Sequence, residues 1–474
     1  MVSLLILGCN DKTTASTEFV EDELVNPIVT NSVDRDLSAI KEEGVLRALI
    51  VYSSTSYFLY RGQPMGFEYE LLNKLAEDLD LKLELVISDN LDNQFEVLNR
   101  GDVDLIAHGL TITNQRKWEV DFTESLYTTR QVLVQKKPDN YRSLKWSTVK
   151  KSLVQDPIEL IGETISIRRN SAYWERLQSL SNEIGGKIHI DTLDSSLSDD
   201  EIIDLVAQGE VKYTVADENL ARINASYQPV LDVSVPISFT QRIAWVTRKK
   251  AKNFRETVND WIKNERKTLR YKVTYNKYFK NKRSFKKRVQ SDYYSLNNKQ
   301  ISQYDDIIKK HAEVLGWDWR LLASQAYQES KFNPNAQSWV GARGLMQIMP
   351  ATAMDLEIVD ISDPEESLRG GTLYLKDIYN KFTDVKDKKE RQKFTLAAYN
   401  CGYGHILDAK RLAVANNLDP LRWDDNVEKM LLKLRYPKYY NKPNIRYGYV
   451  RGSEPVTYVR EIFDRFEHYK AFFN

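Results

Sequence analysis

A chain of 474 residues is too long for one ordinary domain, so we expect two or three. The 68 Lys and Arg residues balance the 67 Asp and Glu residues, and the absence of a net positive field argues against a nucleic-acid partner. With 42% hydrophobic residues the chain can bury a large core, yet no apolar stretch approaches the roughly 20 residues that a membrane-spanning helix needs.

Residues 1–9 form a short apolar start that ends in a cysteine. The apolar run 2–7 leads into Gly8 and Cys9, and polar residues follow. This order resembles the lipobox of bacterial lipoproteins, which implies that Cys9 is lipidated and anchors the chain on the periplasmic side of the outer membrane. The run is short and has no basic residues before it, so a frayed apolar start is the alternative.

Residues 10–42 are rich in Thr, Ser, Asn, Asp and Glu, a composition typical of a flexible tether. Residues 43–279 have a different pattern. Strand-like runs alternate with helical patterns in this stretch, which indicates an α/β domain with a largely parallel sheet. The strands are expected at 46–52, 82–87 and 103–107, and the helices at 67–79 and 95–100.

Six basic residues lie within 280–288, and we interpret the segment 280–299 as a solvated basic linker. Attraction to an anionic wall or lipid surface is the alternative. From residue 300 helical periodicity replaces the strand pattern, so residues 300–474 are expected to form an all-α domain. Helices are expected at 304–315, 318–329, 350–356, 367–381 and 391–399. The only cysteine besides Cys9 is Cys401, which excludes a disulfide framework.

Three short blocks follow one another in the all-α domain. They are Gln-Glu-Ser at 328–330, Gly-Leu-Met-Gln at 344–347 and Ala-Tyr-Asn at 398–400. Each block alone is weak, because an isolated Glu is usually a solvated helix position and the other two suit a helix stop and a packed ring. Together and in this order they resemble the soluble-lytic-transglycosylase domain, a lysozyme-like α fold, over roughly residues 303–469.

That resemblance implies an enzyme that cleaves the MurNAc–GlcNAc β-1,4 bond of peptidoglycan strands without a metal or organic cofactor. It implies that Glu329 is the catalytic residue and that Tyr399 hydrogen-bonds to it. The residues that it places against the substrate are Ser330, Met346, Gln347, Tyr399, Asn400 and Tyr458.

Physical reasoning about Glu329 points the same way. Glu329 follows Leu322 by seven residues and Ala326 by three, so all three share one face of a helix. A carboxyl on an apolar face, near a helix C-terminus, has its charged form disfavoured and its pKa raised. Glu329 is therefore expected to stay protonated near neutral pH and to act as a general acid.

A second carboxylate close to Glu329 in the sequence is missing. Residues 331–349 contain no Asp or Glu, whereas glycosidases usually use a pair of carboxylates. This favours a route in which one Glu acts first as acid and then as base, and in which the C6 hydroxyl of the sugar attacks to leave a 1,6-anhydro end. Hydrolysis by a lysozyme-type muramidase stays open, since a distant carboxylate can fold in.

The α/β stretch also contains recognisable blocks. Those at 66–72, 101–105 and 109–116 resemble the extracellular solute-binding proteins of amino-acid transporters, which are bilobal and periplasmic. The resemblance implies that Thr111 and Arg116 hold the ligand's α-carboxylate, because a guanidinium grips a carboxylate with two parallel hydrogen bonds. It implies that Asp217 holds the α-amino group and that Tyr57 or Phe58 supplies an aromatic wall. A surface salt bridge is the alternative role for Arg116.

The fusion of both modules resembles the membrane-bound lytic murein transglycosylase F family. This resemblance implies a bilobal regulatory module that binds peptidoglycan-derived peptides or amino acids, followed by a lysozyme-like catalytic domain. The rival from another class is a periplasmic amino-acid or peptide-binding protein without enzymatic activity, whose C-terminal domain is degenerate. Intact Glu329, Ser330 and Tyr399 argue against that rival.

Overall fold

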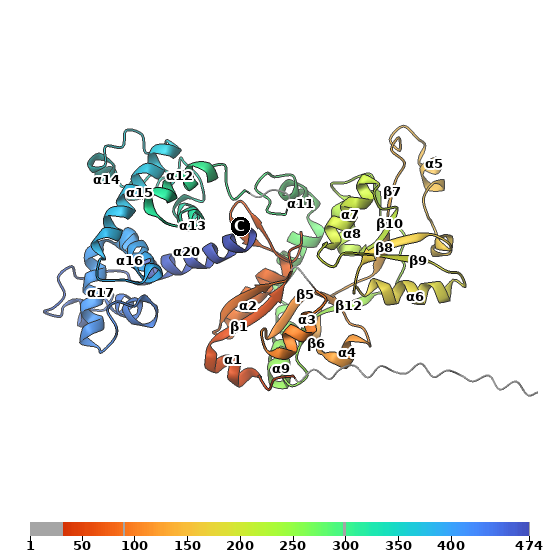
Figure 1. Ribbon diagram of the computed structural model, residues 1–474, viewed down its shortest axis with the longest axis horizontal. Helices are drawn as coiled ribbons and strands as arrows, with labels where there is room; N and C mark the ends of the chain where they lie inside the picture. Colours follow the sequence, from red (N-terminus) through yellow and green to blue (C-terminus); the bar gives the residue numbers. More distant parts are fainter. Residues whose placement is uncertain (1–31, 89–90, 297–299, 474) are drawn as a thin grey trace, which may run out of the picture.

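The computed structural model describes residues 32–88, 91–296 and 300–473. It shows a helical module built from the C-terminal third and a two-lobed α/β module built from the rest (Figure 1). The predicted multidomain fold class, a bilobal α/β module followed by an all-α domain, is confirmed. Cys9 and residues 10–31 of the predicted tether lie outside the described residues.

The first lobe is built on a five-stranded sheet in the order β4-β1-β5-β12-β6. β1 pairs in parallel with β4 and β5, but β12 returns from the second lobe and inserts antiparallel between β5 and β6. The expectation of a largely parallel sheet therefore holds for only half of it. The strands are β1 (Val45–Ile50), β4 (Lys82–Ile87), β5 (Leu105–Thr111), β6 (Asp121–Thr129) and β12 (Gln241–Thr247).

Helices and one hairpin complete the first lobe. The hairpin of β2 (Phe58–Tyr60) and β3 (Gln63–Met65) projects from the loop that follows β1. The helices are α1 (Leu37–Glu43), α2 (Phe67–Asp78), α3 (Gln94–Arg100), α4 (Arg116–Glu119), α9 (Lys252–Glu265) and α10 (Leu269–Tyr275), and a π-helical turn follows at Asn276–Lys280.

The second lobe contains two small sheets. The chain enters it from β6 and returns through β12, so two connections join the lobes and can act as a hinge. Its strands are β7 (Gln131–Lys136), β8 (Thr164–Arg168), β9 (His189–Leu193), β10 (Tyr213–Asp217) and β11 (Leu231–Asp232). Its helices are α5 (Trp146–Lys151), a 3-10 turn at Pro157–Leu160, α6 (Tyr173–Glu183), α7 (Asp199–Gln208) and α8 (Glu218–Ala225).

The helical module packs its helices around one apolar core. The core includes the inward faces of α13, α15, α16 and α20, and α20 packs against both α13 and α16. The helices are α12 (Asp305–Leu315), α13 (Trp319–Ser330), α14 (Pro350–Asp355), α15 (Pro364–Lys381), α16 (Lys388–Cys401), α17 (Tyr403–Ala415), an irregular turn at Trp423–Val427, α18 (Glu428–Lys433), α19 (Pro437–Tyr440) and α20 (Ser453–Phe472).

The segment 280–299 is not the solvated linker that its charge predicted. Residues Lys282–Val289 form helix α11, whose Phe285 and Val289 join the apolar core of the α/β module. Arg288 is also buried, and its guanidinium donates to the Ser284 hydroxyl. These three residues have helical i, i+3, i+4 spacing, and the lysines between them face solvent. α11 therefore extends the α/β module.

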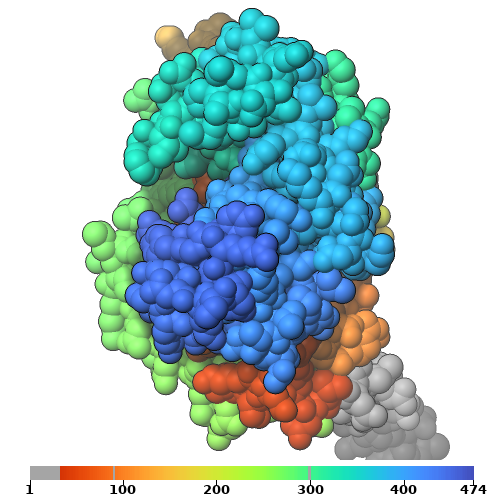
Figure 2. Space-filling view, turned by 90° about the vertical axis from the view of Figure 1, so that its left-hand side faces the viewer, coloured from red at the N-terminus to blue at the C-terminus, as the bar shows by residue number. Residues whose placement is uncertain are grey.

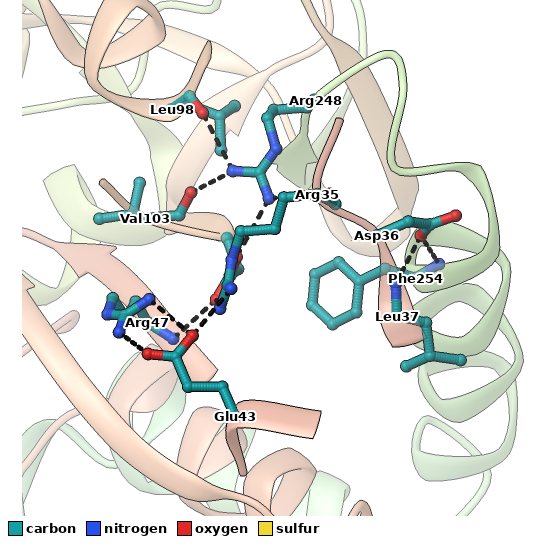
Figure 3. Close-up of polar contacts among 10 residues, drawn as sticks. Arg35, Asp36, Leu37, Glu43, Arg47, Leu98, Val103, Arg248 and Phe254 are labelled. Atoms are coloured by element: carbon teal, nitrogen blue, oxygen red, sulfur yellow. Dashed lines mark hydrogen bonds and ion pairs between the residues drawn. The ribbon is translucent and has the colours of Figure 1, made fainter. Parts of the chain in front are cut away.

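The predicted tether also ends earlier than residue 42. Residues 32–43 lie on the first lobe, where Arg35 and Arg248 both bond Asp104 Oδ1, at 2.7 and 3.0 Å (Figure 3). The side chains of Asp104 and Arg248 are fully buried. Asp36 accepts the backbone N–H of Leu37 at the start of α1 and that of Phe254 on α9. This network fixes the start of the described chain to the sheet.

Helix α20 joins the two modules. It begins in the core of the helical module and its last turn lies against the first lobe (Figure 1). Tyr469 donates a hydrogen bond to the carbonyl of Gly62 in the β2–β3 hairpin at 2.8 Å, and Tyr52 donates to the carbonyl of Ala471 at 2.7 Å. One continuous helix therefore contacts both modules.

Candidate active site and ligand cleft

Glu329 lies in the last turn of α13. Asp318 caps the start of this helix by accepting the N–H of Arg320, and residues 321–326 are buried. The helix ends because Lys331 and Phe332 take left-handed backbone conformations, with φ of 52° and 60°. The side chain of Glu329 is partly exposed at this end. The predicted inward face of the helix is confirmed by the buried Leu322 and Ala326.

The carboxyl of Glu329 is held by a tyrosine from the other end of the helical module. Tyr458, which is buried on α20, donates its hydroxyl to Glu329 Oε1. Burial raises the pKa of Glu329 to about 8, although the hydrogen bond from Tyr458 acts in the opposite direction. No second carboxylate of the described residues perturbs this pKa. Near neutral pH the site therefore presents one protonated acid.

The structure corrects two expectations about neighbouring residues. Tyr399 does not bond Glu329, because its hydroxyl donates to the backbone carbonyl of Met346 at 2.7 Å. The side chain of Met346 is fully buried and packs beside Gly371 of α15, so it cannot line a substrate surface. The tight Gly344 turn directs the Met346 side chain into the core and leaves only its backbone near Tyr399.

Three further residues were predicted to contact the substrate, namely Gln347, Ser330 and Asn400. Gln347 has a left-handed backbone, and its amide donates to the carbonyls of Ala336 and Gly344 at 3.0 and 3.1 Å. Ser330 is buried and donates to the Ala326 carbonyl of its own helix. Asn400 is partly exposed near the end of α16. Ser330 and Gln347 are thus held in place by local hydrogen bonds.

Figure 2 views the helical module end on and shows its surface hollowed between the teal atoms around residue 330 and the dark blue atoms near the C-terminus. Sequence reasoning missed Gln325, which lies one helical turn before Glu329. Gln325 is fully buried, and neither atom of its amide has a partner among the described residues.

A second site lies between the lobes of the α/β module. Thr111 and Arg116 of the first lobe and Asp217 of the second line the same cavity of about 50 Å³. Arg116 donates to the Thr111 carbonyl at 3.1 Å, and the charge of Glu175 acts on it without a contact ion pair among the described residues. Burial lowers its pKa. This arrangement leaves the guanidinium without an acidic partner in contact with it, unlike the surface salt bridge that was the alternative.

Asp217 is the last residue of β10 and faces the cleft from the opposite lobe. Its Oδ1 is buried, and in the described part of the chain that atom has no hydrogen-bond partner. Burial, followed by the charge of Asp199, raises the pKa of Asp217 to about 7. A cationic group from a ligand would satisfy this carboxylate.

The predicted aromatic wall comes from other residues. Tyr57 is buried, and its hydroxyl is paired with His468 of α20, so it faces the helical module. Phe58 packs against Tyr278 and Tyr294 in the core. The aromatic residues that line the cleft include Tyr127, Tyr173 and Phe279. Sequence reasoning missed them because they come from β6, α6 and the turn after α10, which only the folded chain brings together.

Two family models match the chain. Residues 306–419 match the Transglycosylase SLT domain, and residues 48–281 match the Bacterial extracellular solute-binding proteins, family 3. A membrane-bound lytic murein transglycosylase F from Desulfosudis oleivorans is 33% identical over 428 residues, which cover 90% of each chain. The protein of the same name from Photobacterium profundum is 30% identical and covers 90% of this chain and 80% of its own.

Among solved structures, the P235GK mutant of an arginine-binding protein from T. maritima is similar to part of this chain. It is 21% identical, covers 51% of this chain and 98% of its own, and has a TM-score of 0.42.

Proposed function

The chain belongs to the membrane-bound lytic murein transglycosylase F family, and from this premise we propose how its two modules act. It is a peptidoglycan lytic transglycosylase of the cell envelope. We propose that Glu329 is its acid and base, that Tyr458 positions the carboxyl, and that the α/β module regulates cleavage by binding a peptidoglycan-derived ligand. The observation that carries the catalytic part is the hydrogen bond that the Tyr458 hydroxyl donates to the carboxyl of Glu329.

The first chemical step needs a proton donor. With its pKa raised to about 8, Glu329 is largely protonated at neutral pH and can donate to the glycosidic oxygen of the leaving GlcNAc. The bond from MurNAc C1 to that oxygen then breaks. The carbonyl oxygen of the sugar's own N-acetyl group attacks C1 and stabilises the developing cation, so no second protein carboxylate is needed.

The second step returns the proton to Glu329. The carboxylate formed in the first step takes the proton of the C6 hydroxyl, and O6 attacks C1 while the N-acetyl oxygen leaves. The product is a 1,6-anhydro ring, and no water is consumed. The absence of a second carboxylate among the causes of the Glu329 pKa shift supports this route over a lysozyme-type hydrolysis.

Mass spectrometry of digested peptidoglycan tests this mechanism. We expect muropeptides with anhydro ends, which are lighter by one water than hydrolysed ones, and no product above background from Glu329→Gln. Predominantly reducing ends would make the enzyme a muramidase. Near wild-type digestion by Glu329→Gln would mean that another residue is the acid.

The regulatory proposal rests on the cleft of the α/β module. Thr111 and Arg116 would hold a carboxylate and Asp217 an ammonium group, from opposite lobes. Other contacts already cross between the lobes, because Ser54 donates through its backbone and its hydroxyl to Asp200, at 2.9 and 2.7 Å. A ligand gripped from both sides would favour the arrangement in which the lobes are close.

Contacts between the modules offer a route to the active site. A Cβ on Gly62, at the turn of the β2–β3 hairpin, would lie 2.8 Å from the ring of Phe332 and 2.6 Å from the Tyr469 hydroxyl. Phe332 follows Glu329 by three residues, and Tyr469 lies on the same helix as Tyr458. Movement of the hairpin would therefore reach both members of the Glu329–Tyr458 hydrogen bond.

We further propose that Cys9 is the lipid attachment site and that the chain is held on the periplasmic side of the outer membrane. None of the helices in the described ranges has both the length and the apolarity needed to cross a bilayer. Two acyl chains on one cysteine give stable anchoring where one is marginal. With its full upstream gene expressed in a Gram-negative host, the wild type should sediment with outer membranes and Cys9→Ser should not. A wild type in the soluble fraction would contradict the anchor.

A further inference from the structure

The cleft of the α/β module extends beyond the residues expected to hold an amino acid. A second cavity, of about 80 Å³, adjoins the one that contains Arg116 and shares Asp217 with it. Glu68, the second residue of α2, lines only this second cavity. The side chain of Glu68 is 2% exposed, and no described residue forms a hydrogen bond with its Oε2.

Glu68 lines the second cavity together with Gly109 and Tyr127. Gly109 has no side chain, and a Cβ there would lie 3.1 Å from the Tyr127 hydroxyl and 3.9 Å from Glu68 Oε1. Glu68, Asp217 and Tyr127 line the same cavity, and burial, followed by the charges of these two acids, raises the pKa of Tyr127. Two carboxyls from opposite lobes therefore meet at one cavity, each with an unpartnered oxygen.

An unpartnered buried carboxyl oxygen destabilises a fold, so its presence needs a reason. Glu70, two residues later on the same helix, shows the usual solution, because it binds Lys277 and Tyr278. Glu68 has no such cation. Arg116 lines only the other cavity, whereas Arg168, which is ion-paired with Asp199 at 3.5 Å, lines both. The two cavities thus differ in that the guanidinium of Arg116 lines only one of them and the carboxyl of Glu68 lines only the other.

We propose that the cleft binds a diamino carboxylic acid, free or as a residue of a short peptide, with its carboxylate on Arg116, one ammonium group on Asp217 and the second ammonium group on Glu68. The inference rests on the proposed ligand-binding role of the module and names the chemical class of its ligand. Burial raises the pKa of Glu68 to about 8. An ammonium group beside it favours the ionised form, so binding near neutral pH releases a proton.

Calorimetry on the full chain with L-lysine and L-norleucine tests the inference, because norleucine lacks only the terminal ammonium group. We expect lysine to bind about 10–100-fold more tightly, the range for a hydrogen bond between charged groups. Glu68→Gln should reduce this preference to about threefold or less and leave the affinity for norleucine nearly unchanged. Glu77→Gln is the matched control, since Glu77 lies exposed on the same helix and should keep the preference.

A second pair of probes distinguishes the source of the diamino group. Stem tripeptides that end in 2,6-diaminopimelate or in alanine are titrated in the same way, and a preference confined to this pair assigns the site to a peptide. If the wild type binds both members of each pair with equal affinity, and if this binding still depends on Arg116, the proposed ammonium site at Glu68 is wrong but the ligand-binding role of the module stands. Failure of every probe to bind would overturn the ligand-binding role with it. The wild-type comparisons do not depend on the stability of any variant.

Discussion

The protonation of Glu329 sets the pH range in which the enzyme can work. Only the protonated form can donate to the leaving oxygen, so the rate should be highest below a pH of about 8 and fall as the pH rises through that value. Glu329→Gln should lower turnover by about 10²–10⁴-fold at every pH and remain folded. Turnover measured from pH 5 to 10 tests this, and a rate that still rises above pH 8 would contradict it.

Tyr458 is expected to tune that pH range. Its hydroxyl donates to the carboxyl and favours the ionised form, so its removal should raise the pKa of Glu329 further. Tyr458→Phe should therefore move the alkaline limb of the rate profile to higher pH, besides lowering the maximal rate. Tyr399→Phe is the matched control, because that hydroxyl bonds the Met346 carbonyl. If Tyr399→Phe displaces the alkaline limb and Tyr458→Phe does not, then Tyr399, and not Tyr458, tunes the pKa of Glu329.

At the scale of residues, helical spacing was enough to place Glu329 on the inward face of α13. It was not enough to identify its partner, because Tyr458 is 129 residues away and the motif pointed to Tyr399. Met346 was misplaced for a related reason. A motif shows that a residue is near the site, but the turn at Gly344 decides whether its side chain or its backbone faces outward.

At the scale of elements, the buried network around Asp104 should dominate the stability of the first lobe. Asp104 joins Arg35, Arg248 and the backbone N–H of Arg47, and its removal leaves a fully buried guanidinium unpaired. Such a loss costs about 3–5 kcal/mol. Asp104→Ala should therefore lower the urea midpoint of the α/β module strongly, as measured by circular dichroism.

Asp102→Ala is the control for that experiment. Asp102 lies two residues before Asp104 but is exposed, and its partner is the exposed Arg100. Because water screens such a pair, the midpoint should remain at the wild-type value. Equal effects of the two substitutions would mean that the buried network does not hold the lobe together.

Periodicity predicted helices α12 to α16 of the catalytic domain within three residues at each end, but it did not predict α17 to α20. It failed for α11, where the basic residues outnumber the buried Phe285, Arg288 and Val289 and make the segment resemble a solvated linker. It also could not foresee the antiparallel β12, since pairing depends on how the chain returns from the second lobe. The failures for α11 and β12 concern contacts between segments that are distant in sequence.

At the scale of the whole molecule, the two modules share one helix. α20 carries Tyr458 beside the catalytic carboxyl and, three turns later, His468 and Tyr469 against the first lobe. A helix of this kind moves largely as a unit, so a displacement of the first lobe should change the position of Tyr458. The β2–β3 hairpin adds a second contact next to Phe332. We therefore expect ligand binding and catalysis to be coupled through the full chain.

That coupling can be measured by adding stem peptides to a digestion assay of the full chain. A coupling free energy of about 1–3 kcal/mol corresponds to a change in turnover of about 5–150-fold, provided that the ligand prefers one arrangement of the lobes. Arg116→Ala should abolish both peptide binding and the change in turnover. Gly62→Ala should retain peptide binding but reduce the change, because its Cβ would overlap Tyr469 and Phe332 and alter the contact between the modules.

Gly162→Ala is the matched control for Gly62→Ala. Both glycines have positive φ, 80° and 74°, so both substitutions strain the backbone in the same way, but a Cβ on Gly162 would meet nothing within 4 Å. Its response to peptide should equal that of the wild type. If Gly62→Ala also responds like the wild type, the hairpin does not transmit the signal. If peptide binds the wild type without changing its turnover, the module serves to target the enzyme, since a ligand bound equally well in both arrangements shifts neither.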